Sequence, residues 1–203
     1  MKSVKFGHDD IVPSKVVCVG RNYVEHISEL GNEISDEMVI FIKPNAAIGT
    51  DLCAYHQEQL HYEAELCFLY QQGSFSAVAV GLDLTKRSLQ SKLKAKGLPW
   101  ERAKTFSGSA LFSDFVAIES INKALTVTLD INNQRKQTGS VAMMLYSPEV
   151  ILKEIMSFIE LEDGDIVMTG TPAGVGKIVA GDVFQGQVII DDIMLISKTW
   201  QAK

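Results

Sequence analysis

Apolar and polar positions along the chain follow a strand-like pattern more often than a helical one. Short runs rich in β-branched and aromatic residues recur, and most are bounded by Gly, Pro, Asn or Asp, which is typical of strands and their turns. The adjacent residues Asn132 and Asn133, between two polar and apolar runs, predict the turn of a β-hairpin. Strands are therefore expected at residues 15–20, 39–43, 60–70, 77–84, 115–118, 125–131, 165–170 and 191–200.

Two longer segments show the pattern of amphipathic helices. Residues 85–96 alternate with helical spacing, and Gly97 is placed to end that helix. Residues 147–159 begin with Ser147 as a candidate N-cap and Pro148 in the first turn, where proline is well tolerated. Both helices are expected to lay one apolar face on the rest of the protein.

A third helix is expected near the N-terminus and is followed by a polar segment. Residues 22–30 predict a short helix, with Asn22 as its cap and Gly31 at its end. Residues 31–38 are polar and acidic, which is typical of a mobile loop. Repeats, low-complexity tracts and linkers are absent from the sequence, so we expect one domain over residues 1–203, mainly β with a few helices (α+β).

Composition and charge exclude several classes of partner. A formal net charge of −6 and a pI near 5.2 argue against binding to nucleic acid or to an anionic membrane. Lys92, Lys94 and Lys96 form a small basic cluster without interleaved aromatic residues, and we interpret it as a solvated helix face. No apolar run approaches the roughly 18 residues that a membrane-spanning helix needs.

The N-terminus and the cysteines indicate a reducing compartment. The first ten residues contain no apolar segment of the kind that secretory signals carry. Cys18, Cys53 and Cys67 are odd in number and show no C-x-x-C spacing, so buried thiols are a better interpretation than disulfides. We therefore expect a cytoplasmic protein.

The stretch LHYEAELCF, residues 60–68, places two glutamates in an otherwise apolar strand. Side chains at positions i and i+2 share a face and lie about 6–7 Å apart, so Glu63 and Glu65 are neighbours. Two like charges side by side are unfavourable unless a positive group lies between them. The alternation predicts a core face formed by Tyr62, Ala64, Leu66 and Phe68, and a second face formed by His61, Glu63, Glu65 and Cys67.

A third acid, Asp83, is the only charge in its apolar strand. Taken alone, Asp83 is equally consistent with a cap for the following helix, and the two glutamates with a solvent-facing strand edge. Taken together, three carboxylates at the ends of apolar strands predict an all-oxygen site. Such a site suits Mg²⁺ or Mn²⁺ better than zinc, and it leaves coordination positions for water or substrate oxygens.

Histidines near the same strand leave a different metal site open. One or both of His56 and His61, together with Glu63, would form the two-histidine, one-carboxylate set that binds non-haem iron. The strand alternation places His61 on the face of the glutamates. The residues alone therefore do not decide between the two sites.

Two further features are candidates for chemistry. His26 and Glu29, at i and i+3, share one helix face, and a carboxylate beside a histidine raises the basicity of the imidazole, as a general base requires. A surface pair without a role is equally consistent with that spacing. Lys104 is a lone cation between apolar residues; it is a candidate for the site, although lysines in such positions often extend outward to solvent.

The glycine-rich stretch TGTPAGVGKI, residues 169–178, departs from a phosphate-binding loop. Thr171 stands where that motif needs its first glycine, and Ile178 follows Gly176-Lys177 where the motif needs Ser or Thr. A plain turn between strands is one alternative. We favour another, in which the glycines let a small ligand approach backbone N–H groups and Thr171 adds a hydroxyl.

Taken in order, these features resemble the fumarylacetoacetate hydrolase family over about residues 15–200. The resemblance is closest to its small single-domain branch, the acylpyruvases and oxaloacetate decarboxylases. It rests on the motifs GRNYxxH (20–26), FIKP (41–44), HYExEL (61–66), the strand aspartate with LTxRxLQ (83–90), GLPWxxAKxF (97–106) and LExGDIVMTGTPAGVG (161–176).

The resemblance implies a mixed β-roll, a homodimer and a set of site residues. Glu63, Glu65 and Asp83 would be ligands of Mg²⁺ or Mn²⁺, with His61 a neighbour and not a ligand. His26 and Glu29 would form a catalytic dyad on a lid, about residues 22–38, that orders when substrate binds. Lys104 would act in catalysis and would also bind substrate. The other substrate-binding residues would be Arg21, Arg87, Gln90 and Thr171.

The activity implied is cleavage of the C–C bond of an acylpyruvate, such as acetylpyruvate or fumarylpyruvate, to pyruvate and a carboxylic acid. Decarboxylation of oxaloacetate and keto–enol or double-bond isomerisation of a 2-oxo acid pass through a similar enolate, so they are alternatives on the same metal site. We expect hydrolysis because the dyad is most useful when water must be activated. A protein that only binds a metal and a dicarboxylate is a more remote alternative.

Two departures from the family pattern concern the pocket. The sequence has Lys86-Arg87-Ser88 where the family commonly has Ala-Arg-Asp, so an acid is lost at Ser88. Downstream of Lys104, residues 107–115 lack the proline-rich wall of many relatives. Both changes are expected to bear on substrate identity more than on the metal site.

Overall fold

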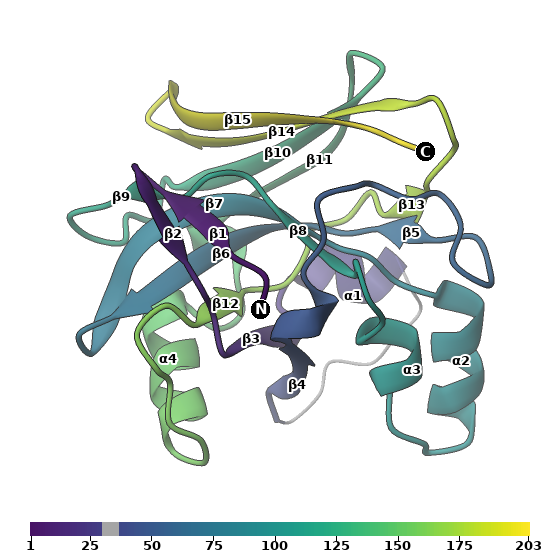
Figure 1. Ribbon diagram of the computed structural model, residues 1–203, viewed down its shortest axis with the longest axis horizontal. Coiled ribbons are helices and arrows are strands. Elements are labelled where there is room, and N and C mark those ends of the chain that lie inside the picture. Colours follow the sequence, from purple (N-terminus) through teal and green to yellow (C-terminus); the bar gives the residue numbers. More distant parts are fainter. Residues whose placement is uncertain (30–36) are drawn as a thin grey trace.

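A seven-stranded sheet forms the centre of the fold, shown in Figure 1. The computed structural model describes residues 1–29 and 37–203. The sheet follows the order β4-β3-β12-β6-β7-β8, with β9 paired to β7, and only β12 and β3 run parallel. Its strands are β3 (Lys15–Gly20), β4 (Val39–Pro44), β6 (Ala64–Gln71), β7 (Ser74–Asp83), β8 (Ala110–Phe112), β9 (Val116–Ala117) and β12 (Ile166–Met168).

A four-stranded antiparallel sheet covers one side of the central sheet, at the top of Figure 1. Its order is β11-β10-β14-β15, and Gly186 on β14 lies so close to the central sheet that an added Cβ would meet Val80 at 2.8 Å. Glycine is therefore required where the two sheets approach. The strands are β10 (Thr126–Ile131), β11 (Gln134–Ser140), β14 (Val183–Ile190) and β15 (Ile193–Gln201).

The helices lie on the other side of the central sheet, in the lower part of Figure 1. In the described residues no helix is long and apolar enough to cross a bilayer. The helices are α1 (Val24–Glu29), α2 (Arg87–Ala95), α3 (Glu101–Lys104) and α4 (Pro148–Met156). Short elements complete the fold: β1 (Val4–Phe6) with β2 (Asp9–Ile11), β5 (His61–Tyr62) with β13 (Gly176–Lys177), and 3-10 turns at Asn45–Ala47 and Val141–Met143.

The hydrophobic alternation in residues 60–70 is confirmed by two separate cores. Tyr62, Leu66 and Phe68 belong to the large core that includes side chains from the four-stranded sheet. Cys67 belongs to a second core on the opposite face of the central sheet. The segment therefore contributes side chains to two hydrophobic cores, and the face that carries the glutamates is buried rather than solvent-exposed.

The cap signals predicted the end of α2 and the start of α4 well, whereas α2 begins at Arg87 and α4 ends at Met156, both inside the predicted ranges. Ser147 caps α4 by accepting a hydrogen bond from the N–H of Val150, and Gly97 follows α2 with a positive φ of 61°. At the end of α2, the N–H of Leu98 donates to the C=O of Leu93 at 2.9 Å, which completes a Schellman-type cap.

The predicted cap of α1 is wrong. The helix begins at Val24, and the Asn22 amide donates instead to the carbonyls of Tyr146 and Thr169, at 3.0 and 2.8 Å. Asn22 thus ties the start of α1 to two distant segments. Of the lid expected at about residues 22–38, residues 30–36 lie outside the described part of the chain.

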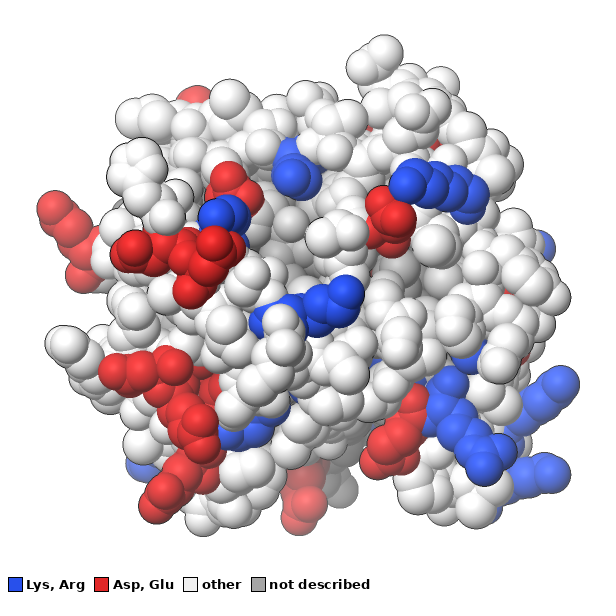
Figure 2. Space-filling view, in the orientation of Figure 1, with Lys and Arg blue, Asp and Glu red and all other residues white. Residues whose placement is uncertain are grey.

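Exposed basic side chains gather over α2 and α3, at the lower right of Figure 2. Lys92 and Lys96 are exposed, as a solvated helix face predicts. For Lys94 that interpretation is wrong, because its side chain is half-buried and its Nζ lies 5.8 Å from the centre of the Trp100 ring.

Candidate active site

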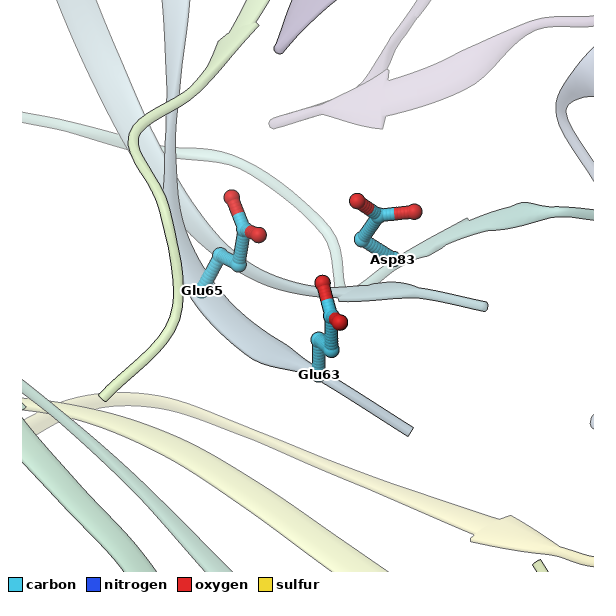
Figure 3. Close-up of side chains that lie close together, drawn as sticks. All are labelled: Glu63, Glu65 and Asp83. Carbon is cyan, nitrogen blue, oxygen red and sulfur yellow. The ribbon is translucent and has the colours of Figure 1, made fainter. Parts of the chain in front are cut away.

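Three buried carboxylates converge at the end of the central sheet, as Figure 3 shows. Glu63 occupies the one-residue break between β5 and β6, Glu65 is on β6, and Asp83 ends β7. The N–H of Asp83 donates to the C=O of Glu63 at 2.8 Å, which sets the register of the two strands. The three residues are 5%, 2% and 1% exposed, and one oxygen of each lies within 4.8 Å of the others.

Cations lie between these like charges. Lys104 Nζ donates to Glu63 and Asp83, each at 2.7 Å, and Arg87 donates to the second oxygen of Glu63. Burial lowers the pKa of Lys104, but Asp83 and Glu63 raise it more, so the net shift is upward. Lys104 therefore stays charged, and the interpretation in which it extends outward to solvent is wrong.

The acids differ in how well they are compensated. Burial opposes the ionisation of Glu63, but Lys104 and Arg87 outweigh it and hold the pKa of Glu63 well below its ordinary value. Burial, reinforced by Asp83 and Glu63, raises the pKa of Glu65 well above its ordinary value, although the N–H of Gly170 donates to Glu65 at 2.7 Å. Lys104 thus compensates Glu63 more fully than Glu65.

The carboxylate cluster fits a hard divalent cation. Asp83 Oδ1 is buried and accepts no hydrogen bond, and burial with the two neighbouring acids raises the pKa of Glu65 more than Lys104 lowers it. Three anionic oxygen donors that converge within a few ångströms are the ligand set such ions prefer. Glu63, Glu65 and Asp83 are the residues that would hold the ion.

The alternative iron site is contradicted. In the part of the chain that the structure describes, the group able to hold a metal contains the three carboxylates and no histidine. The His56 ring packs on Phe106 with centroids 4.9 Å apart, and the backbone of His61 pairs with Thr85. Asp83 likewise does not cap α2, whose cap position is Lys86.

Lys43 on β4 lies beside the carboxylates and was not among the predicted site residues. Its side chain is fully buried, and its three N–H groups donate to the carbonyls of Lys104 and Ser109 and to the Ser109 hydroxyl. Its Nζ also lies 2.9 Å from Asp83 Oδ1 without directing a hydrogen bond at it. Lys43 therefore anchors the backbone of Lys104 and leaves a lone pair of Asp83 available.

His26 and Glu29 on α1 form the pair that their spacing predicts. His26 Nδ1 lies 3.3 Å from Glu29, and the N–H of Gly174 donates to both oxygens of Glu29 at 3.1 and 3.2 Å. A carboxylate at Nδ1 favours the tautomer with its proton there, which leaves Nε2 as the basic nitrogen. His26 is buried and lines the cavity that contains the carboxylates.

The glycine-rich loop contacts the site through its backbone, but its N–H groups bind side chains of the protein itself. The N–H groups of Gly170 and Gly174, expected to face a ligand, bind the carboxylates of Glu65 and Glu29 instead. The Thr171 hydroxyl donates to the C=O of Ala64 at 2.8 Å. One loop therefore positions both the metal-site acid and the acid of the dyad.

A single cavity brings the predicted residues together. Glu29 contacts it through His26, and the remaining predicted residues line it directly. Trp100, Phe41 and Lys94 line it as well and were missed; the aromatic residues give no signal in the sequence that separates them from core residues. The predicted lining residues are Arg21, His26, Glu63, Glu65, Asp83, Arg87, Gln90, Lys104 and Thr171.

The fold is mainly β and carries a buried carboxylate triad and a histidine–glutamate pair, and comparison with known proteins gives the family. The model of the fumarylacetoacetate (FAA) hydrolase C-terminal domain matches residues 15–197. The chain belongs to the fumarylacetoacetate hydrolase family, whose members are enzymes.

Individual relatives agree. Oxaloacetate tautomerase YcgM of Escherichia coli is 35% identical over 195 residues, covering 85% of this chain and 87% of the relative. A crystal structure from Oleispira antarctica is 34% identical with a TM-score of 0.92, covering 100% of both chains. The crystal structure of fumarylpyruvate hydrolase from Pseudomonas aeruginosa, in complex with Mn²⁺ and pyruvate, is 27% identical with a TM-score of 0.89. The match covers 98% of this chain and 94% of the relative.

Proposed function

We propose that this protein catalyses the metal-dependent interconversion of the keto and enol forms of oxaloacetate or a closely related 2-oxo acid. The observation that carries the proposal is one cavity that contains a buried carboxylate triad and a histidine oriented by Glu29. The relative named as an oxaloacetate tautomerase supports this reaction among those that such a cavity allows. Tautomerisation thereby takes precedence over the hydrolysis expected from the sequence.

Glu63, Glu65 and Asp83 would hold Mg²⁺ or Mn²⁺, and the Mn²⁺ in the Pseudomonas relative supports that choice. When bound, such a cation stabilises negative charge that develops on the 2-oxo oxygen. Lys104 adds to that field through its charge alone, because its three N–H groups donate to Glu63, Asp83 and Thr85. We assign the orientation of the substrate carboxylate to Arg87 and Gln90, which share a hydrogen bond of 2.8 Å.

In this proposal His26 moves the proton. Its Nε2 takes a proton from C3 of the keto acid, the electron pair of the C–H bond forms the C2–C3 double bond, and the imidazolium then gives its Nε2 proton to the 2-oxo oxygen to form the enol. Glu29 holds the Nδ1 proton and stabilises the imidazolium that forms. The reverse sequence returns the keto acid, so no other reactant is needed.

Hydrolysis of an acylpyruvate is the second candidate. The same His26–Glu29 pair would deprotonate a water that attacks the distal carbonyl, the C3–C4 bond would break, and pyruvate enolate would leave. The Pseudomonas fumarylpyruvate hydrolase supports this candidate. Decarboxylation of oxaloacetate gives the same enolate without an attacking water.

The test uses the purified protein with Mg²⁺, with Mn²⁺ and with excess EDTA. Decay of the ultraviolet absorbance of enol-oxaloacetate measures tautomerisation, and pyruvate release from oxaloacetate and from acetylpyruvate measures decarboxylation and hydrolysis. We expect the enol absorbance to decay in a metal-dependent way, at a rate faster than pyruvate is released from either acid. Metal-dependent pyruvate from acetylpyruvate, with enol decay at the buffer rate, would establish the second candidate instead.

A further inference from the structure

Gln137 on β11 is a buried polar side chain beside the strand that carries the glutamates. It is 1% exposed, and both polar atoms of its amide have partners. The oxygen accepts a hydrogen bond from the N–H of Ala64 at 2.9 Å, and the nitrogen donates to the Thr171 hydroxyl and to the C=O of Pro172, each at 2.8 Å. A reversed amide would set its N–H groups against the N–H of Ala64, so the side chain is held in one orientation.

The backbone that Gln137 contacts lies between two acids of the metal site. Ala64 stands between Glu63 and Glu65 in the sequence. β12 ends before it reaches Ala64, so that edge of β6 has no neighbouring strand there. Two side chains supply the missing hydrogen bonds: the N–H of Ala64 donates to Gln137, and its C=O accepts from the Thr171 hydroxyl at 2.8 Å.

The same amide holds the loop that binds two acids of the site. Its nitrogen donates to residues 171–172. On one side of that contact the N–H of Gly170 donates to Glu65 at 2.7 Å, and on the other side the N–H of Gly174 donates to Glu29 at 3.1 and 3.2 Å. The contact therefore lies between the N–H group that binds a metal-site acid and the N–H group that binds the acid of the dyad.

β11 supports this loop closely. The strand is at the edge of the four-stranded sheet. An added Cβ at Gly139, two residues after Gln137, would lie 2.8 Å from the Cβ of Pro172. The loop thus packs directly on β11, and a small change in the side chain between them is expected to move the loop.

We infer that Gln137 is a positioning residue for two acids of the site, the metal-site acid Glu65 and the dyad acid Glu29. It acts on them through the backbone, because its hydrogen bonds go to Ala64 and the 170–174 loop and not to the carboxylates. The assignment to the metal site is independent of the reaction, and the assignment to the dyad rests on the proposed function. Groups that orient metal ligands from outside typically change metal affinity by about 10–100-fold.

Gln137→Met tests the assignment to the metal site. Methionine keeps the length of the side chain and removes its three hydrogen bonds. Calorimetric titration with Mn²⁺, well below the thermal midpoint of the variant, should give a Kd about tenfold higher than that of the wild type. A residue that only contributes to stability would lower the thermal midpoint and leave this Kd unchanged. An unchanged Kd in folded Gln137→Met would therefore overturn the inference.

Two further variants complete this test. Gln134→Met is the matched control, because Gln134 is an exposed glutamine on the same strand, and it should not change the Kd. If Gln137→Met does not fold, Thr171→Val takes its place, since it removes the hydroxyl that connects Gln137 to the C=O of Ala64. A raised Kd for Mn²⁺ then supports the inference, and an unchanged Kd overturns it.

A double-substitution cycle tests the assignment to the dyad. With saturating Mn²⁺, Gln137→Met should lower kcat for the conversion of enol-oxaloacetate by about tenfold. Because this effect passes through Glu29, the same substitution made in Glu29→Ala should lower kcat by less than about threefold. Equal losses in the two backgrounds would show that the amide does not act through Glu29, and would overturn that assignment.

Metal binding and turnover fail separately. In a protein that does not convert enol-oxaloacetate, the proposed function is refuted and the Mn²⁺ titration alone decides the inference. Conversion of enol-oxaloacetate with a Mn²⁺ affinity and a kcat that do not depend on Gln137 supports the proposed function and overturns the inference.

Discussion

At the scale of single residues, a lone charged side chain among apolar residues was the most informative signal. It identified Asp83 and Lys104, which the structure places 2.7 Å apart. Lys43 in VIFIKP meets the same criterion but was not among the predicted site residues. Sequence alone could not have shown that Lys43 donates its hydrogen bonds to Lys104 and Ser109, because those contacts depend on the packing of β4 against α3.

Glu65 is expected to be essential for metal binding. Glu65→Gln removes an anionic ligand while keeping an oxygen for the N–H of Gly170. We expect Mn²⁺ affinity to fall by more than about 100-fold, since even groups outside the direct ligand set typically cost 10–100-fold. Calorimetric titration with Mn²⁺ measures this. The exposed Glu119→Gln is the control, and unchanged affinity in Glu65→Gln would remove Glu65 from the metal site.

His26 is expected to act in proton transfer. His26→Ala should slow metal-dependent conversion of enol-oxaloacetate by about 10²–10⁴-fold while Mn²⁺ affinity stays within a few-fold of wild type. Stopped-flow absorbance and calorimetry give the two numbers. If both acylpyruvate hydrolysis and oxaloacetate decarboxylation occur, His26→Ala should abolish the first and spare part of the second; equal loss would mean that His26 positions substrate instead.

At the scale of elements, the start of α2 shows how a departure from the family pattern is accommodated. The N–H groups of Ser88 and Leu89 donate to Glu58, at 3.0 and 3.3 Å, so an acid from another loop occupies the N-terminal end of the helix. Lys86 donates to Gln57 and lies 4.8 Å from the Phe106 ring centre. The sequence predicted this helix from its own pattern, but the partner loop is thirty residues away and carries no pattern that predicts the contact.

Gly174 is expected to be irreplaceable in its loop. Its φ is +99°, and an added Cβ would lie 2.0 Å from the C=O of Lys136, so Gly174→Ala forces the loop away from Glu29. We expect a loss of about 2–4 kcal/mol in the free energy of unfolding, measured with urea. Gly73→Ala is the control: its φ is +85° but nothing lies within 4 Å, so about 1 kcal/mol is expected. Equal losses would show that the Lys136 contact does not matter.

At the scale of the whole molecule, the two-residue period of the chain predicted most long strands but not their order. β1, β2, β8 and β13 are two or three residues long, too short to show a period. The pairing of β12 with both β3 and β6 joins segments about 150 and 100 residues apart. The carboxylates of the site were predictable because they lie at the ends of strong strands. The family resemblance implied a mixed β-roll but no strand order, and the order that brings the carboxylates together comes from the structure.

Asp165 connects these distant strands and gives stability a pH dependence. It accepts hydrogen bonds from the N–H groups of Ser14, Lys15 and Glu162, and its side chain is fully buried. Burial raises the pKa of Asp165, but the bonds from Lys15, Glu162 and Ser14 lower it more, so the net shift is downward. Its contribution is therefore complete above the unfolded pKa, near 3.8, and is lost as pH falls through the folded pKa.

Asp165→Asn should lower the free energy of unfolding by about 2–4 kcal/mol at pH 7. The difference from wild type should shrink on acidification below about pH 4. Urea unfolding at several pH values tests both statements. Asp163→Asn, an exposed neighbour whose one hydrogen bond to the N–H of Gln72 an asparagine can keep, should change little. A difference that stays constant with pH would contradict the assigned shift.

The homodimer implied by family resemblance remains a prediction at this scale. On β15, Ile193 and Met194 are 65% and 56% exposed, so the four-stranded sheet has apolar side chains at its margin. Light scattering coupled to size-exclusion chromatography gives the mass directly. A dimer mass agrees with the resemblance, and a monomer across the working concentration range contradicts it.

The central claim is that Glu63, Glu65 and Asp83 form the metal centre on which the chemistry depends. The most direct measurement is the anomalous scattering of a crystal soaked in Mn²⁺. The account predicts a strong manganese peak within bonding distance of an oxygen from each of the three carboxylates. A peak elsewhere, or none at this cluster when the soaked protein is active, would contradict it.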